Sequence, residues 1–252
     1  MGRVIAIANQ KGGVGKTTTA VNLAACMAAA NKKTLLIDLD PQGNATQGLG
    51  IDKNGLNASV YDLLVNNTHP PDIVVPTEWD HLFLLPSNRE LVGAEVELID
   101  EDAREFRLKS QLVAIRDDYD YIFIDCPPSL SILTLNGLVA ADGILVTLQC
   151  EYYALEGLSE LLQTVILVRD NLNPALTVFG VLLTMYQHTN LCKQVIDDVR
   201  SHLGDSVFQT IVPRNVTLSE APSFGKPVIY YDLKCAGSQA YLALAREVIT
   251  RG

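Results

Sequence analysis

Hydrophobic positions along this chain form short continuous runs that alternate with longer segments of helical spacing. Short runs that lack a polar residue at every second position are typical of strands covered on both faces. The runs predict strands at 3–8, 34–38, 82–86, 121–125, 143–149, 177–184 and 207–212. Apolar residues three and four positions apart predict helices at about 16–30, 90–98, 103–117, 130–140, 154–171, 190–203 and 238–250.

This alternation predicts an α/β fold: a doubly wound, mainly parallel sheet flanked by helices, with ligands at the carboxyl ends of the strands. No repeat, low-complexity tract or linker rich in Ser and Gly divides the chain, so we expect one domain over residues 1–252. The polar stretch 66–72 is predicted to be a surface loop rather than a domain boundary.

The segment after the first predicted strand has the composition of a phosphate-binding loop. Residues 10–18 read Gln-Lys-Gly-Gly-Val-Gly-Lys-Thr-Thr and precede a predicted helix. Glycines let backbone N–H groups approach phosphate oxygens, and a helix N-terminus favours an anion. We expect Lys16 to reach the β- and γ-phosphates and Thr17 to ligate Mg²⁺. The loop departs from G-x-x-x-x-G-K-[ST], since Gln10 replaces the first glycine, and Lys11 adds a second cation.

Carboxylates follow two further predicted strands. Strand alternation is expected to place Asp38 and Asp40 on the same side, where a carboxylate can hold a metal-bound water or orient the attacking water. Asp125 follows four apolar residues, the Walker B arrangement that holds Mg²⁺ directly or through water. Two alternatives stay open: residues 40–43 as a simple turn after a strand, and Asp125 as a helix cap.

Composition narrows the class of protein. The 252 residues are 48% apolar, enough for one continuous core, and no run approaches the roughly 18 apolar residues of a membrane span. We expect no signal peptide and a cytoplasmic location. The net charge of −10 discourages unspecific adhesion to nucleic acid or anionic lipid. The acidic segment 95–105 is predicted to be a solvated face, with a docking surface as the alternative.

The five cysteines are odd in number and widely spaced, and no two of them form a C-x-x-C pair. This pattern predicts free, buried or half-buried thiols in a reducing compartment. Disulfides, zinc sites and iron–sulfur ligation find no support in it.

Four segments together resemble the ParA/Soj chromosome- and plasmid-partition ATPases, which belong to the deviant Walker A group of P-loop proteins with MinD as a relative. The segments are residues 11–18, 38–44, 125–128 and 211–215. Further matching stretches are 150–157 and 218–225, so the resemblance spans nearly the whole chain.

The resemblance implies ATP or ADP with Mg²⁺ as cofactors, and a nucleotide-sandwich homodimer in which Lys11 reaches the phosphates held by the partner. It implies that Asp40 positions the attacking water. The implied catalytic residues are Lys11, Lys16 and Asp40. The implied nucleotide contacts are Lys11, Gly12, Gly13, Val14, Gly15, Lys16, Thr17, Thr18, Pro213 and Asn215. The implied Mg²⁺ residues are Thr17, Asp38 and Asp125. Asn215 suits the edge of adenine, although a turn residue is the alternative.

The resemblance also implies non-specific DNA binding by the ATP dimer, association with the nucleoid, and a ParB-like partner that stimulates hydrolysis. This chain lacks the arginine that the family carries before Thr189 and Asn190, has Thr217 in place of another, and lacks the arginine-rich stretch at 232–237. The candidate DNA contacts that remain are Lys193, Arg200, Arg214 and Lys234. Because such binding is electrostatic, weakened or redirected DNA binding stands beside normal nucleoid binding as an expectation.

Three other functions stay open at this stage. A MinD-like membrane cycle requires a basic amphipathic C-terminal helix, whereas residues 241–252 carry few cations and are predicted to pack on the sheet, so no membrane anchor is expected. An iron–sulfur protein of the nitrogenase-reductase type shares the loop and the dimer. A metabolic ligase or kinase on the same fold is the remaining alternative.

Overall fold

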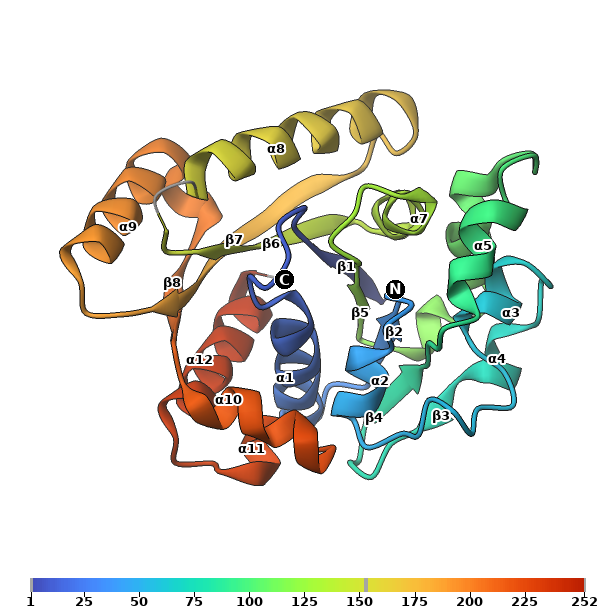
Figure 1. The fold of residues 1–252 in the computed structure, drawn as a ribbon, viewed down its shortest axis with the longest axis horizontal. Helices are drawn as coiled ribbons and strands as arrows, with labels where there is room; N and C mark the ends of the chain where they lie inside the picture. Colours follow the sequence, from blue (N-terminus) through green and yellow to red (C-terminus); the bar gives the residue numbers. More distant parts are fainter. Residues whose placement is uncertain (1, 152–153, 252) are drawn as a thin grey trace.

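The computed structural model describes residues 2–151 and 154–251. An eight-stranded sheet lies at its centre, with the strand order β3-β4-β2-β5-β1-β6-β7-β8 (Figure 1). Neighbouring strands pair in parallel except for β3 and β4, which are antiparallel. The strands are β1 (Arg3–Ala8), β2 (Thr34–Asp38), β3 (Val75–Pro76), β4 (Leu82–Leu85), β5 (Tyr121–Asp125), β6 (Gly143–Gln149), β7 (Thr177–Tyr186) and β8 (Val207–Pro213). The predicted doubly wound, mainly parallel sheet is confirmed, and only the short β3 was not predicted.

Helices cover both faces of this sheet, as a doubly wound fold requires (Figure 1). One face packs against α3 (Val60–Leu64), α4 (Pro70–Ile73), α5 (Leu91–Glu97), α6 (Arg107–Leu112), α7 (Ile132–Ala140), α8 (Ala154–Asn171) and α9 (Asn190–Leu203). The other face packs against α1 (Lys16–Ala29), α2 (Asn44–Gly48), α10 (Val216–Glu220), α11 (Val228–Tyr231) and α12 (Ala236–Arg251).

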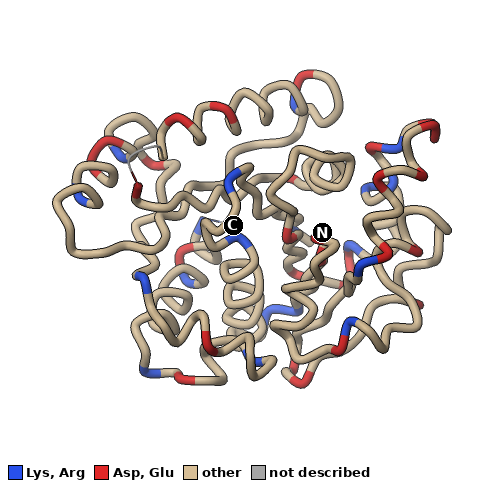
Figure 2. Tube along the Cα trace, viewed as in Figure 1, with Lys and Arg blue, Asp and Glu red and all other residues tan. Residues whose placement is uncertain are grey.

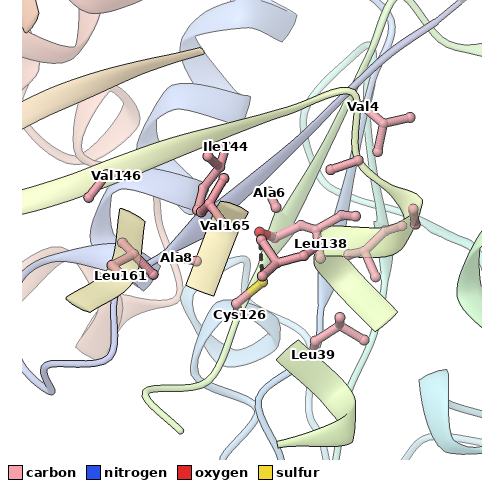
Figure 3. Packing of buried hydrophobic residues seen from close by; sticks show 14 of the residues in the cluster. Val4, Ala6, Ala8, Leu39, Cys126, Leu138, Ile144, Val146, Leu161 and Val165 are labelled. Carbon is pink, nitrogen blue, oxygen red and sulfur yellow. Dashed lines mark hydrogen bonds between the residues drawn. The ribbon is translucent and has the colours of Figure 1, made fainter. Parts of the chain in front are cut away.

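The central strand β1 shows how the two faces are built. Alternate residues point to opposite sides of a strand, so Val4 and Ala6 enter the core under α7 and α8, while Ile5 and Ile7 enter the core under α1. Figure 3 shows the first of these cores, where side chains of α8 lie over those of β6. Because both faces are buried, the strands need continuous apolar runs, and this is why sequence pattern alone located them.

The predicted helix over 103–117 is wrong as a single helix. The segment contains a 3₁₀ turn at Arg104–Phe106, the α-helix α6 and a second 3₁₀ turn at Arg116–Asp118. Asn136 of α7 is fully buried and explains the break, because its amide donates to the Arg104 carbonyl at 2.9 Å and accepts from the Leu108 N–H at 3.0 Å. A side chain from another helix therefore satisfies backbone groups that a continuous helix would have paired internally.

Short elements account for the other differences. The stretch 66–72 was predicted to be a loop, but α4 begins inside it at Pro70, with Pro70 and Ile73 buried. The helices α2, α3, α10 and α11 were not predicted either. Helices of four or five residues are too short to show a hydrophobic period and owe their stability to tertiary packing.

The C-terminal helix α12 packs on the sheet as predicted, and Tyr241, Leu244 and Val248 are buried between it and its neighbours. Within the described residues, no helix is long and apolar enough to cross a membrane. The five cysteines are free thiols, four of them buried and Cys235 half-buried, in agreement with the prediction. The acidic residues Glu97, Asp100, Glu101 and Asp102 are exposed.

Candidate active site

The three predicted chemical segments meet at the carboxyl ends of neighbouring strands. β5 lies between β1 and β2, and in this register Asp125 stands beside both Ile7 of β1 and Asp38 of β2. The loop of residues 9–15 follows β1 directly and leads into α1. Parallel strands bring these loops to one edge of the sheet although they are far apart in sequence.

The loop after β1 has the backbone of a phosphate cradle. Gly13 and Gly15 have φ angles of +75° and +87°, in a region that residues with a side chain rarely adopt, and Gly15 is the N-cap of α1. Asn9 links the loop to β6, because its Oδ1 accepts from the Lys11 N–H at 2.9 Å and its Nδ2 donates to the Thr147 carbonyl at 2.7 Å. Asn9 was missed at the level of sequence, although its position just after the strand was an available signal.

The two lysines of the loop have different surroundings. Lys16 is 7% exposed and its Nζ donates to the Lys11 carbonyl at 3.0 Å. Burial lowers the pKa of Lys16, while the nearby Asp125, Cys126 and Asp40 act in the opposite direction. The Lys11 side chain is 51% exposed and forms an ion pair with Glu151, with 2.6 Å between Nζ and Oε2. Lys16 thus belongs to the interior of its own loop, whereas Lys11 lies at the surface.

Asp125 is a buried carboxylate with neither oxygen hydrogen-bonded to any residue in the described part of the chain. Burial raises its pKa well above the ordinary value, and the neighbouring Asp38 adds to that rise, while the Thr17 hydroxyl and Lys16 lower the pKa. Two buried carboxylate oxygens without a geometric hydrogen bond, with the Thr17 hydroxyl nearby, fit a divalent cation. Carboxylate and hydroxyl oxygens are hard ligands that Mg²⁺ prefers, and Thr17 and Asp125 offer both types.

Asp38 is also buried, but its oxygens are occupied. Its Oδ2 accepts from the backbone N–H and the hydroxyl of Thr46, both at 2.8 Å, and its Oδ1 accepts from the Asp40 N–H at 3.1 Å. Burial is the main cause that raises its pKa to about 6. Because β2 ends at Asp38, strand alternation does not extend to Asp40, which is half-buried and lies in the pocket wall.

Two adjoining pockets lie at this edge of the sheet. The first, about 460 Å³, is lined by the phosphate loop together with Asp40, Gln42, Asn44, Pro128 and Met185. The second, about 280 Å³, is lined in part by Pro213 and Asn215 of the β8–α10 region and by Pro222 of the 3₁₀ helix that follows α10. Gly15, Thr18 and Met185 border both pockets. The Asn215 Oδ1 is buried and lacks a hydrogen-bond donor among the residues described, so it can accept from a bound group.

Comparison with known proteins agrees with this geometry. Residues 2–178 match the family model of an AAA domain. The chain is 54% identical over 252 residues to the chromosome partitioning protein ParA of Myxococcus xanthus, covering 100% of this chain and 89% of that protein. It is also 54% identical over 253 residues to the sporulation initiation inhibitor protein Soj of Bacillus subtilis, covering 100% of both. The chain belongs to the ParA/Soj family of chromosome-partitioning ATPases.

A solved structure supports the same fold for this ParA/Soj family member. The cobyrinic acid a,c-diamide synthase of Mycobacterium smegmatis, with bound ADP and magnesium, superposes with a TM-score of 0.87 at 38% identity. The match covers 99% of this chain and 94% of that one. The pockets described above therefore lie in a P-loop ATPase fold.

The four candidate DNA contacts of this ParA/Soj family member are spread over three segments. Lys193 and Arg200 lie on α9, Arg214 follows β8, and Lys234 lies between α11 and α12. Asp197 and Asp198 share α9 with the two cations, and the Arg200 guanidinium donates to the Gln209 carbonyl at 3.2 Å. In Figure 2, Lys and Arg positions and Asp and Glu positions are both scattered along the tube. The matching stretch 150–157 includes residues 152 and 153, which lie outside the described residues.

Proposed function

We propose that this protein is a Mg²⁺-dependent ATPase switch for chromosome or plasmid partition, in which ATP converts monomers into a nucleotide-sandwich homodimer. The observation that carries the proposal is the contrast between the two lysines of one loop. Lys16 is buried and directed at its own loop, whereas Lys11 is exposed and free to exchange its surface partner for phosphate oxygens of a second subunit.

The ATP phosphates occupy the pocket of the loop, in contact with residues 11–18. Thr17 and Asp125 would hold Mg²⁺ directly or through water, with Asp38 beside Asp125, and a bound ion would neutralise charge on the phosphates. Of the three, Asp125 has the strongest structural support as a Mg²⁺ residue, because its buried oxygens have no hydrogen-bond donor in the part of the chain that the structure describes. Adenine occupies the second pocket, where the Asn215 Oδ1 accepts from the exocyclic amine and the Pro213 carbonyl lies alongside.

Hydrolysis uses three side chains. Asp40 orients the attacking water, Lys16 stabilises charge on the phosphates of its own subunit, and Lys11 of the partner subunit does so across the interface. Charge on the transferred phosphoryl group is spread over its oxygens, so a cation supplied by a second subunit lowers the barrier and couples hydrolysis to dimerisation. A lone subunit is therefore a slow ATPase.

The dimer binds DNA non-specifically. A ParB-like protein stimulates ATP hydrolysis, which releases the protein from DNA. The protein therefore acts in the cytoplasm and at the nucleoid. The family supports this cycle, whereas the scattered cations on α9 and near α12 support weakened DNA binding.

A MinD-like membrane cycle is disfavoured, because the apolar face of α12 is already buried. A ligase would turn over ATP only with a small acceptor substrate, whereas an ATPase switch hydrolyses ATP slowly without an acceptor.

The decisive experiment measures two quantities for the wild type and Lys11→Ala. The first is molar mass in solution with Mg²⁺ and either ADP or ATP, and the second is the rate of ATP hydrolysis. We expect a monomer with ADP and a dimer with ATP for the wild type. Lys11→Ala is expected to hydrolyse ATP at least about tenfold more slowly, because one transition-state cation is typically worth several kcal/mol. Normal hydrolysis by Lys11→Ala, or by wild type too dilute to dimerise, would overturn the proposal.

A further inference from the structure

A buried hydrogen-bond network fixes the backbone around Asp40, and two of its members belong to none of the nucleotide motifs. The Thr46 hydroxyl donates to the Asp38 Oδ2 at 2.8 Å and accepts from the Ser87 N–H at 2.9 Å. The Ser87 hydroxyl in turn donates to the Asp40 carbonyl at 2.8 Å. Asp38, Thr46 and Ser87 are each completely buried.

The network closes a ring around the turn that follows β2. Asp38 accepts from the Asp40 N–H on one side of the turn, and Ser87 donates to the Asp40 carbonyl on the other. The loop also lies very close to Ser87, since a Cβ at Gly43 would stand 2.8 Å from the Ser87 carbonyl oxygen. Both peptide groups of Asp40 are therefore held. Asp38 of β2 holds its N–H, while its carbonyl accepts from Ser87, after β4, and from the Gly43 N–H of the turn at 2.9 Å.

The Asp40 carboxylate has little support of its own. Its Oδ1 accepts from the Gln42 N–H at 2.9 Å, two residues along the same loop, and the side chain is partly exposed in the phosphate pocket. The direction of the carboxylate is thus set by the backbone that carries it. A catalytic group must be held within about 0.5 Å of its productive place, so the anchors of this backbone affect the rate.

We infer that Thr46 and Ser87 are positioning residues for Asp40, which they hold against the phosphate pocket through its backbone. The inference rests on the proposed role of Asp40 in orienting water. Neither residue touches the nucleotide pocket or the phosphate loop: Thr46 lies on α2 and Ser87 follows β4. Their removal is expected to impair the chemical step and to leave ATP binding and ATP-dependent dimerisation intact.

The test compares kcat and KM for ATP hydrolysis among Ser87→Ala, Thr46→Val and Thr46→Ser, with wild type and Asp40→Ala as references. Ser87→Ala and Thr46→Val are expected to lower kcat roughly tenfold to a hundredfold with KM for ATP within about twofold. Thr46→Ser retains the hydroxyl and is expected to keep kcat within about threefold of the wild type.

Ser59→Ala is the matched control, because Ser59 is also completely buried and also hydrogen-bonded, to the Tyr61 N–H at the start of α3. Urea unfolding of each variant separates lost stability from lost chemistry, and Thr46→Val serves if Ser87→Ala does not fold. A kcat for both network variants within twofold of the wild type, or a fall no larger than in Ser59→Ala, would overturn the inference. Full activity of Asp40→Ala would instead remove the proposed role of Asp40 and, with it, the positioning.

Discussion

Lys11 and Lys16 illustrate at the residue scale how surroundings divide the work of identical side chains. Lys16 is enclosed by its loop and loses part of its basicity to burial, while nearby acids maintain its charge. Lys11 is at the surface, and Glu151 is its ion-pair partner. That pair must open before Lys11 can reach another subunit, so Glu151 competes with the proposed interface.

Replacing Glu151 by Gln is therefore expected to tighten the proposed ATP dimer. An exposed ion pair contributes about 0.2–1 kcal/mol, and each dimer breaks two, so the dimer dissociation constant should fall roughly 2- to 30-fold. Analytical ultracentrifugation with ATP over a concentration series measures the change. Glu156→Gln on α8 is the control, since Glu156 is exposed and has no ion pair in the described chain. A weaker dimer for Glu151→Gln would mean that Glu151 itself serves the interface.

Glu247 is a carboxylate that stabilises the fold. Burial alone would raise its pKa, but the Gln209 and Thr210 N–H groups, at 2.7 and 3.0 Å, and the nearby Arg251 lower it below the ordinary 4.5. A lowered folded-state pKa means that the stabilisation is complete above about pH 4.5 and is lost as the pH falls through the folded-state value.

Glu247→Gln is expected to lower the free energy of unfolding by about 1–3 kcal/mol near neutral pH, because hydrogen bonds to a charged group are lost. The difference from wild type should shrink as the pH drops below about 4.5. Urea unfolding over a pH series provides the measurement, with the exposed Glu220→Gln as control. A difference that stays constant with pH would contradict the assignment to the ionised carboxylate.

At the scale of elements, the turn after α2 meets the 3₁₀ helix Ala221–Phe224 backbone to backbone. Gly50 and Gly225 have φ angles of +74° and +62°, and a Cβ on Gly225 would lie 2.6 Å from the Gly50 Cα. Pro222 of the same 3₁₀ helix lines the second pocket, and α2 carries Thr46 of the network around Asp40. This contact joins the proposed adenine pocket to the loop of the proposed catalytic aspartate.

Gly225→Ala is thus expected to destabilise the protein by about 1–3 kcal/mol and to weaken ATP binding, since strain and overlap act together. Gly204→Ala is a matched control: its φ is +52°, but no atom lies within 4 Å of the added Cβ. Urea unfolding and titration with a fluorescent ATP analogue compare the two variants. Equal effects would show that backbone strain alone, rather than the Gly50 contact, sets the cost.

For the whole molecule, charge governs the proposed binding to DNA. The net charge is −10, and the four candidate cations lie on three segments, with acids beside them on α9. Non-specific DNA binding depends on neutralisation of phosphates by Lys and Arg, so each lost cation lowers the affinity. It also reduces the slope of log affinity against log salt concentration by about one.

We therefore expect the proposed ATP dimer to bind DNA weakly and with a shallow dependence on salt. A gel shift at low salt, with ATP and the Asp40→Ala variant to prevent hydrolysis, measures it. ADP in place of ATP is the control, because it should leave monomers. Tight binding with a steep salt slope would contradict the expected weakening and would indicate a cationic surface assembled across the dimer.

Sequence alone determined the parts of this protein whose physics is local. Buried parallel strands need continuous apolar runs, so every predicted strand was found, and a phosphate cradle needs a contiguous loop of glycines and lysine before a helix. The long helices followed from their period, whereas the helix over 103–117 failed because a distant Asn136 interrupts it.

Tertiary structure decided which of the singled-out residues are free to act. The ion pair between Lys11 and Glu151 joins residues 140 positions apart, and the bond from Ser87 to Asp40 spans 47. No local pattern encodes such partners, because folding alone brings these strand ends together. The tertiary structure also leaves Asp125 without a hydrogen-bond partner in the described chain, whereas Asp38 accepts a hydrogen bond from the Thr46 hydroxyl.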